Sequence, residues 1–191
     1  MITTLQKVKD RLQIIDTSVD TLLTQLIETV GARFDNETGR KLERTVGFVE
    51  EFTADQTVMA LGCGPVEAVT KIETWGVDAV AWTEVTPGYG LTAGSVLRLT
   101  ETVGDANTRM RITYTGGYVF PPTEPAAGQT ALPPILERAA IEQVAFMYQL
   151  RTSAGVYRVE VSGGTYLEVS DREWVPWVRT VLSRFRRMIL E

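Results

Sequence analysis

Few side chains in this sequence have the type or the spacing that chemistry requires. The chain contains no histidine and a single cysteine, Cys63, which lies between two glycines. Histidine is the commonest general base and transition-metal ligand, and one cysteine can neither complete a metal site nor form an intrachain disulfide. We therefore interpret Cys63 as a small loop thiol and expect no catalytic, metal-binding or cofactor-binding residues.

Acidic side chains offer the other route to hydrolysis or to a hard metal ion. Glu50 and Glu51 are adjacent, and Asp35 and Glu37 flank an asparagine. Their spacing matches no ligand loop, and adjacent residues of a strand point to opposite faces of a sheet. We predict a solvated acidic surface instead, and hence a protein that is not an enzyme.

Arginine and aromatic side chains are better candidates for function, because they can contact a partner. Arginines near the C-terminus could be a solvated helix face, or they could meet an acidic protein surface or DNA phosphates. Tryptophan is enriched at binding hot spots, although it often packs in cores, and a tyrosine in a Pro-Gly-Tyr-Gly turn is hard to bury. The candidate interface residues are Arg172, Trp174, Trp177, Arg179, Arg184, Arg186, Arg187 and Tyr89.

Two amphipathic segments at the N-terminus predict a helical hairpin that would position the rest of the chain. Residues 4–12 place leucine and valine at spacings of three and four, on one face of a first helix. After a break at residues 15–18, a second helix over residues 19–34 carries a longer apolar stripe, and Gly39 can end the segment in a left-handed conformation. A helix of this length is marginal alone, so its stripe needs a partner surface.

The middle of the chain predicts strands. Short runs of valine, threonine, isoleucine and aromatic residues alternate with turn residues between residues 44 and 118. The expected strands are residues 46–52, 57–61, 66–75, 79–85, 95–99 and 109–115. The last is the clearest, because Met110, Ile112 and Tyr114 alternate with polar residues and give one apolar face.

The C-terminal part predicts helices again. Residues 121–131, rich in proline, glycine and alanine, form a connector, and a broad apolar arc predicts a central helix from Pro133 to about residue 151. Residues 157–169 predict a hairpin around two glycines. A stripe over residues 174–189 predicts a last helix, which either starts at Pro176 or kinks there.

These elements predict an α+β fold in three segments. An N-terminal helical hairpin (residues 1–43) is followed by a β-rich insertion, a small sandwich or barrel-like sheet (44–120), and by a central helix, a hairpin-like segment and a C-terminal amphipathic helix (121–191). We expect segments 1–43 and 121–191 to pack as one helical domain. The chain has 191 residues and 44% hydrophobic residues, enough for a sizeable core.

Composition also excludes several function classes. No run of about 18 apolar residues predicts a transmembrane helix, and the first residues lack the apolar stretch of a secretion signal. The formal net charge of −5 argues against general affinity for nucleic acid, because phosphate binding relies on lysine and arginine.

Six sequence blocks, taken in order, resemble a known family. They are TLQKVK at residues 4–9, DTLL at 20–23, TGR at 38–40, RITYTGGY at 111–118, LPPI at 132–135 and YQLR at 148–151. In this order the chain resembles the head–tail connector (adaptor) proteins of long-tailed bacteriophages, and more narrowly the longer members with a β-rich insertion. The resemblance covers about residues 3–152, whereas residues 156–191 match less well.

This resemblance implies a structural virion protein that is made in the host cytoplasm and located in the neck. Such adaptors form a ring, usually a dodecamer, between portal and tail, where they extend the DNA channel and dock a stopper or tail-completion protein. The implied partners are the portal protein, that stopper or tail protein and other copies of this chain, with no membrane and no cofactor. DNA would pass through the lumen without sequence-specific binding. The family has no catalytic residues to carry over.

These implied partners lead to a specific hypothesis about what the C-terminal arginines bind. We prefer the portal over DNA as the surface that they meet. Replacement of Arg184, Arg186 and Arg187 by alanine is then expected to abolish portal binding and to leave the fold intact.

An alternative function is a ligand-binding or protein-binding module. In that case Trp75, Trp82 and Tyr89 of the β-rich segment would hold a carbohydrate or a partner protein, independently of any ring. A carboxylate-dependent hydrolase and a DNA-binding packaging factor are further alternatives, which the missing histidine and the acidic balance disfavour.

Overall fold

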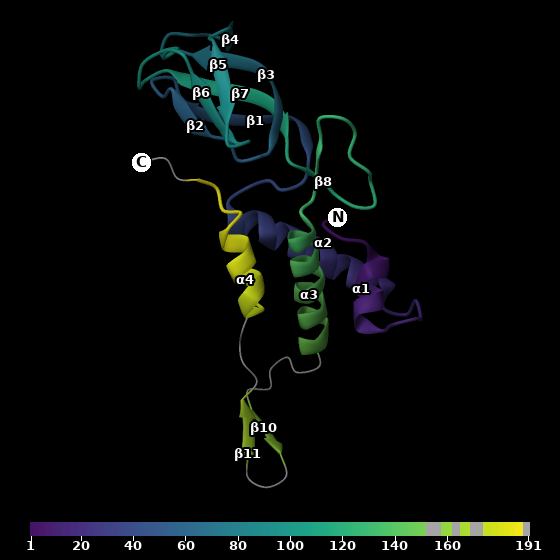
Figure 1. The fold of residues 1–191 in the computed structure, drawn as a ribbon. Helices are drawn as coiled ribbons and strands as arrows, with labels where there is room; N and C mark the ends of the chain where they lie inside the picture. The colour runs from purple at the N-terminus through teal and green to yellow at the C-terminus, as the bar shows by residue number, and fades with distance from the viewer. Residues whose placement is uncertain (152–157, 162–164, 169–173, 189–191) are drawn as a thin grey trace. The chain divides into compact units, whose positions relative to one another are not determined.

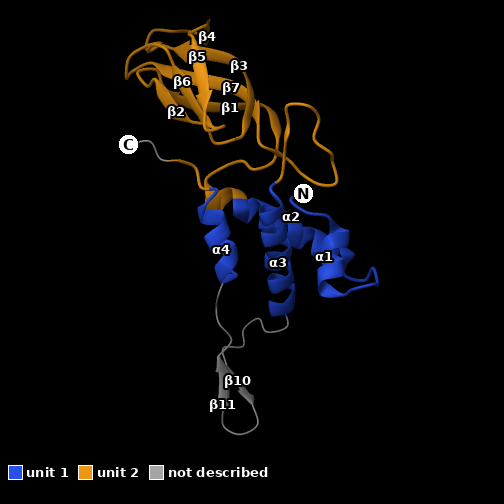
Figure 2. Ribbon diagram, in the orientation of Figure 1, with its two compact units in different colours: residues 1–34, 133–185 blue, residues 35–132, 186–191 orange. Residues whose placement is uncertain are grey.

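Helices and mostly antiparallel strands are separated along the chain in the computed structural model (Figure 1), which confirms the predicted α+β class. The structure describes residues 1–151, 158–161, 165–168 and 174–188. It divides into two compact units (Figure 2): a helical unit, Met1–Phe34 with Pro133–Phe185, and a β-rich unit, Asp35–Leu132 with Arg186–Glu191.

The N-terminal helices form where the apolar pattern predicts them. Helix α1 (Leu5–Leu12) is capped by Thr4, whose Oγ1 accepts a hydrogen bond from the Lys7 N–H at 3.4 Å. Helix α2 (Asp20–Thr38) extends past the predicted residue 34 and ends at Gly39, which has the left-handed φ of 62° that the sequence predicts.

Two further helices complete the helical unit. Helix α3 (Pro134–Leu150) is the predicted central helix and contacts both α1 and α4 (Pro176–Ser183). Ion pairs of 2.7 Å between Lys7 and Glu137 and of 2.8 Å between Arg11 and Glu142 join α1 to α3. The buried side chains of the four helices include Val8, Leu23, Ile27, Val30, Leu136, Ala139, Ala140, Val144, Val178, Val181 and Leu182. None of the described helices is long and apolar enough to cross a membrane.

Helix α4 is shorter than predicted. It starts at Pro176, one of the two alternatives, but it ends at Ser183 rather than near residue 189. The N–H groups of Arg184 and Phe185 donate to carbonyls three residues earlier, which tightens the last turn. The next backbone donor, the N–H of Arg187, bonds the carbonyl of Thr38 at 2.8 Å, so this segment belongs to the β-rich unit.

An antiparallel pair of strands lies between α3 and α4. Strand β10 (Arg158–Val161) pairs with β11 (Thr165–Glu168), in agreement with the hairpin predicted over residues 157–169. The predicted turn, residues 162–164, lies outside the described residues.

The β-rich unit contains a four-stranded and a three-stranded antiparallel sheet, together with one short parallel pair. The four-stranded sheet has the order β1 (Thr45–Thr53), β7 (Arg109–Gly116), β3 (Val66–Trp75), β4 (Thr83–Val85). The three-stranded sheet has the order β2 (Val58–Ala60), β6 (Val96–Leu99), β5 (Tyr89–Thr92). The parallel pair is β8 (Tyr118–Val119) with β9 (Thr130–Ala131).

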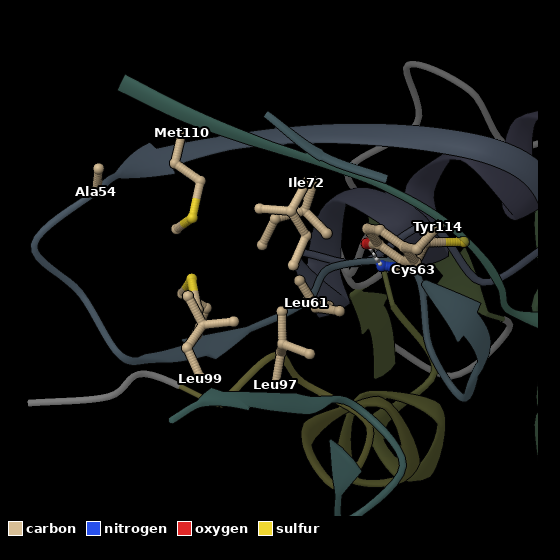
Figure 3. Packing of buried hydrophobic residues seen from close by; sticks show 10 residues of the cluster. Ala54, Leu61, Cys63, Ile72, Leu97, Leu99, Met110 and Tyr114 are labelled. Carbon is tan, nitrogen blue, oxygen red and sulfur yellow. Dashed lines mark hydrogen bonds between the residues drawn. The ribbon is translucent and has the colours of Figure 1, made fainter. Parts of the chain in front are cut away.

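A single core joins the two sheets (Figure 3). Met110, Ile112 and Tyr114 alternate with more exposed residues along β7, which confirms the apolar face predicted for this strand. They pack with Leu97 and Leu99 of β6 and with other buried residues. The inner faces of both sheets therefore share one hydrophobic layer, as in a small sandwich.

Several strands depart from the prediction. Strand β5 begins at Tyr89, within the predicted Pro87–Gly90 turn, and β9 lies in the predicted connector. Strand β4 covers only Thr83–Val85 of the predicted residues 79–85. Strand β5 is exposed along its whole length and contains a glycine, so it shows no apolar alternation, and its pairing with β6 makes it a strand.

Candidate interaction surfaces

Cys63 lies in the core and not in an accessible loop. Its thiol is fully buried and donates to the carbonyl oxygen of Gly116 at 3.3 Å, while its N–H donates to the hydroxyl of Tyr114 at 2.9 Å. Burial raises the pKa of the Cys63 thiol, which disfavours the reactive thiolate. The prediction of a loop thiol is confirmed, because Cys63 lies between β2 and β3, and the structure adds that this loop is packed in the core.

The adjacent acids Glu50 and Glu51 point to opposite faces of β1, as strand geometry predicts. Glu50 Oε2 accepts hydrogen bonds from the Tyr114 hydroxyl at 2.5 Å and from the Gly62 N–H at 2.7 Å. Glu51 forms an ion pair with Arg109. The described residues contain no cluster of three or more side chains that could hold a metal ion.

Ion pairs cover the outer face of the four-stranded sheet. Arg111 donates two hydrogen bonds to Glu73, at 2.5 and 2.9 Å, and Lys71 contacts the same carboxylate at 2.7 Å. The Arg111 hydrogen bonds, followed by that of Lys71, lower the pKa of Glu73 from 4.5 to about 2. Glu73 itself is only 4% exposed. Because Arg111 and Lys71 both bind this buried carboxylate, the two cations are already engaged within the chain.

The three aromatic residues of the alternative binding-module prediction are not brought together on one sheet. Trp75 and Trp82 flank the β3–β4 loop and pack against each other edge to face, with ring centroids 5.6 Å apart. The Arg111 guanidinium lies 4.5 Å from the Trp82 ring centroid. Tyr89 is 46% exposed and lies in β5 of the other sheet.

Three of the C-terminal candidates are accessible on α4 and at its C-cap. Trp177 is 38% exposed, and Arg179 and Arg184 are exposed. Within the described part of the chain, no carboxylate forms an ion pair with either arginine. Trp177 and Arg184 are two helical turns apart and therefore share one face.

Trp174 packs within the helical unit. Its ring centroid lies 5.9 Å from that of Phe34, and the guanidinium of Arg33 lies 4.7 Å from it. Arg172, which the sequence also nominates, lies outside the described residues.

Arg186 and Arg187 bind the rest of the β-rich unit. Arg186 forms an ion pair with Glu37, and Arg187 Nη1 lies 3.1 Å from Glu50. The Arg187 guanidinium also donates to the carbonyl oxygen of Ala60. These contacts hold the segment that follows α4, so the two arginines differ from Arg179 and Arg184 although the sequence groups them together.

An exposed apolar loop was missed by the sequence analysis. Val77 and Val80, between β3 and β4, are 77% and 96% exposed. The sequence gives little signal for this, because a valine-rich run between two tryptophans also fits a buried strand.

These observations define a class of protein: a two-unit α+β chain with a small β-sandwich insertion, whose described polar residues form structural networks and no reactive cluster. No protein-family model matches the sequence, and no curated protein matches it.

Solved structures that share this fold over the whole chain include two from gene transfer agent particles. One is from the neck of an empty gene transfer agent particle, computed with C6 symmetry, with a TM-score of 0.66 and 18% identity. The other is from the virion of a native gene transfer agent particle, with a TM-score of 0.63 and 20% identity. Each alignment covers 100% of this chain and 92% of the other. At these identities the likeness shows the fold.

Proposed function

We propose that this protein is a structural subunit of the neck of a phage-like virion, a head–tail connector that forms a ring between portal and tail. The observation that carries the proposal is the full-length likeness to a chain from the neck of a gene transfer agent particle, at a TM-score of 0.66. The resemblance of six sequence blocks to bacteriophage adaptors, found from the residues alone, supports the same function.

The chemistry of the chain fits a mechanical role. Several of its described carboxylates form ion pairs, such as Glu73 with Arg111 and Glu50 with Arg187, which stabilise the β-rich unit. A connector needs rigid surfaces for its neighbours and no reactive group. A ring around a DNA channel also benefits from a net charge of −5, because a negative protein repels phosphate over about 8 Å at physiological salt.

The exposed face of α4 is the proposed contact with the portal. Arg179 and Arg184 are exposed and can pair with acidic side chains of a partner, and Trp177, on the same face as Arg184, can provide an apolar anchor. Arg186 and Arg187 are excluded from this proposal, since their guanidinium groups already bind Glu37 and Glu50.

Electron microscopy of the protein mixed with its portal tests the proposed function. In side views, we expect a closed ring of this protein stacked coaxially on the portal. The double variant Arg179→Ala with Arg184→Ala should reduce the fraction of portal particles that carry such a ring. Absence of any ring, with or without portal, would overturn the proposal.

The alternative of a carbohydrate-binding or protein-binding module finds less support. Such a site needs an open aromatic face, whereas Trp82 is packed by Trp75 and by Arg111. Tyr89 is exposed but lies in the other sheet.

A further inference from the structure

The β3–β4 loop, residues 76–82, presents an apolar tip. Val77 and Val80 are 77% and 96% exposed, and the only charged side chain of the loop is Asp78. The N–H of Ala79 donates to the carbonyl of Gly76 at 3.0 Å and closes a turn at the tip. A single exposed valine needs no explanation, but two on one turn form a small apolar projection.

The base of this loop is held in place by packing. Trp75 and Trp82 contact each other edge to face at the two ends of the loop, next to the last β3–β4 pair, Thr74 with Thr83. Arg111, fixed by two hydrogen bonds to Glu73, covers Trp82 at 4.5 Å. A loop ordered in this way loses little conformational entropy when its tip binds a partner.

A complementary pocket exists in the same unit. It has a volume of about 400 Å³, and Gln56 lies at its rim. For comparison, a cavity of about 150 Å³ accommodates a benzene ring, so the pocket has room for two valine side chains. Its other lining residues are Phe52, Val58, Met59, Ala60, Arg187 and Met188.

This edge pocket also offers hydrogen-bond donors to the one acidic side chain of the loop. The Arg187 side chain is 35% exposed at the pocket, beside Glu50. Asp78 is exposed and forms no ion pair with any residue that the structure describes. Glu50 and Ala60 use three of the five N–H groups of the Arg187 guanidinium, and an Asp78 carboxylate that enters with the valines can accept from the remaining two.

The loop and the edge pocket are two different surfaces of the β-rich unit. The strand order β1-β7-β3-β4 separates β4 from β1 by three strand spacings, or about 14 Å. The loop leads into β4, whereas the pocket is lined from β1, from β2 and from the segment after α4. Figure 1 shows β4 at the upper rim of this unit, with β1 and β2 below it. A head-to-tail contact requires two different surfaces on each copy, and such contacts generate rings when the rotation closes.

We propose that the β3–β4 loop of one copy inserts Val77 and Val80 into the edge pocket of the next copy, with Asp78 facing Arg187. This inference rests on the proposed ring. The contact is an anchor within a larger interface, because a stable interface buries about 800 Å² on each partner.

Disulfide cross-linking in the full-length protein tests this contact. We would introduce Gln56→Cys at the pocket rim and Val80→Cys at the loop tip, and Cys63 adds no background because it is fully buried. Rings assembled on the portal from the double variant should form a ladder of covalent oligomers on oxidation. A mixture of the two single variants should form mainly dimers that contain one chain of each kind.

The matched control replaces Val46, an equally apolar residue that is 70% exposed on β1, with cysteine. Gln56→Cys with Val46→Cys should not form the ladder. In addition, Val77→Ser with Val80→Ser should prevent ring closure without a change in melting temperature, whereas Val46→Ser should leave the rings intact.

Each outcome separates the two proposals. Rings that form on the portal without a Gln56–Val80 cross-link would overturn the loop contact and leave the connector function standing. An efficient intrachain cross-link between Gln56→Cys and Leu190→Cys in such rings would also overturn it, because the chain's own terminus would then occupy the pocket. If the wild-type protein forms no ring, both proposals fail.

Discussion

At the scale of single residues, the most informative group is the polar network at the end of the sandwich core. The Tyr114 hydroxyl accepts from the Cys63 N–H (Figure 3) and donates to Glu50, which also accepts from the Gly62 N–H. Burial, and then the hydrogen bond to the Glu50 carboxylate, raise the pKa of Tyr114. The tyrosine therefore stays a neutral donor that holds a carboxylate in place, which is a structural role and not an acid–base role.

Removal of the Tyr114 hydroxyl should destabilise the β-rich unit. We expect Tyr114→Phe to lower the free energy of unfolding by about 1–3 kcal/mol, because Glu50 loses a donor and the Cys63 N–H loses its acceptor. Urea unfolding measures the change. Tyr118→Phe is the control, since no described residue hydrogen-bonds the Tyr118 hydroxyl, and an equal loss in both variants would contradict the argument.

Glu73 should make stability depend on pH in acid. Its pKa is about 2 in the folded protein and about 4.5 in the unfolded chain, so its contribution is complete above pH 4.5 and is lost as the pH falls toward 2. We expect Glu73→Gln to cost about 2 kcal/mol at neutral pH and to flatten the stability profile between pH 4.5 and 2. Glu84→Gln, at a carboxylate with 59% side-chain exposure, should leave that profile unchanged.

At the scale of elements, the end of α4 at Ser183 divides the C-terminal arginines into two groups with different roles. A continuous helix to residue 189 would have presented them as one basic surface. Instead, α4 ends, Arg184 caps it, and Arg187 bonds to Ala60 and lies beside Glu50 of the β-rich unit. The triple replacement of Arg184, Arg186 and Arg187 is therefore a poor test of portal binding, because we expect part of its effect to be loss of stability.

Single replacements should separate these two roles. Arg187→Ala should lower the free energy of unfolding by about 1–3 kcal/mol through its lost hydrogen bonds, whereas Arg184→Ala should stay within about 0.5 kcal/mol of wild type. In a portal pull-down, Arg184→Ala should reduce binding despite its unchanged stability. A stable Arg187→Ala protein together with an unfolded Arg184→Ala protein would contradict this assignment.

At the scale of the whole molecule, the chain enters each compact unit more than once. The helical unit is built from Met1–Phe34 and Pro133–Phe185, so the β-rich unit is an insertion whose last piece, Arg186 onward, comes from the end of the chain. A fragment limited to residues 44–118 would lack this piece and the Arg187 contacts. The predicted domain division at residues 43/44 and 120/121 remains a prediction.

The net charge should keep the whole protein from binding DNA. With a formal charge of −5, and with Arg109, Arg111 and Arg187 engaged by carboxylates, we expect no retention of a short DNA duplex at physiological salt. Gel-shift measurements over a range of salt concentrations check this. Binding that weakens steeply with added salt would indicate phosphate contacts and would favour a DNA-binding role over a passive channel wall.

The sequence alone determined the elements whose pattern is local. The apolar stripes of α1 and α2 and the alternation of β7 follow from periods of 3.6 and 2 within one segment, and the left-handed Gly39 follows from the absence of a Cβ at a helix end. The opposite directions of Glu50 and Glu51 follow from strand geometry in the same way.

Only the tertiary structure decided the features that depend on distant partners. Strand β5 exists because β6 pairs with it. Cys63 is buried because it packs against Tyr114 and Gly116. Arg187 holds the segment after α4 in place because Glu50 and Ala60 lie beside it. Val77 and Val80 are exposed because nothing in the described chain packs on the tip of their loop. Burial and strand pairing depend on contacts between segments that are distant in the sequence. The hydrophobic period of one segment does not encode which other segment packs against it.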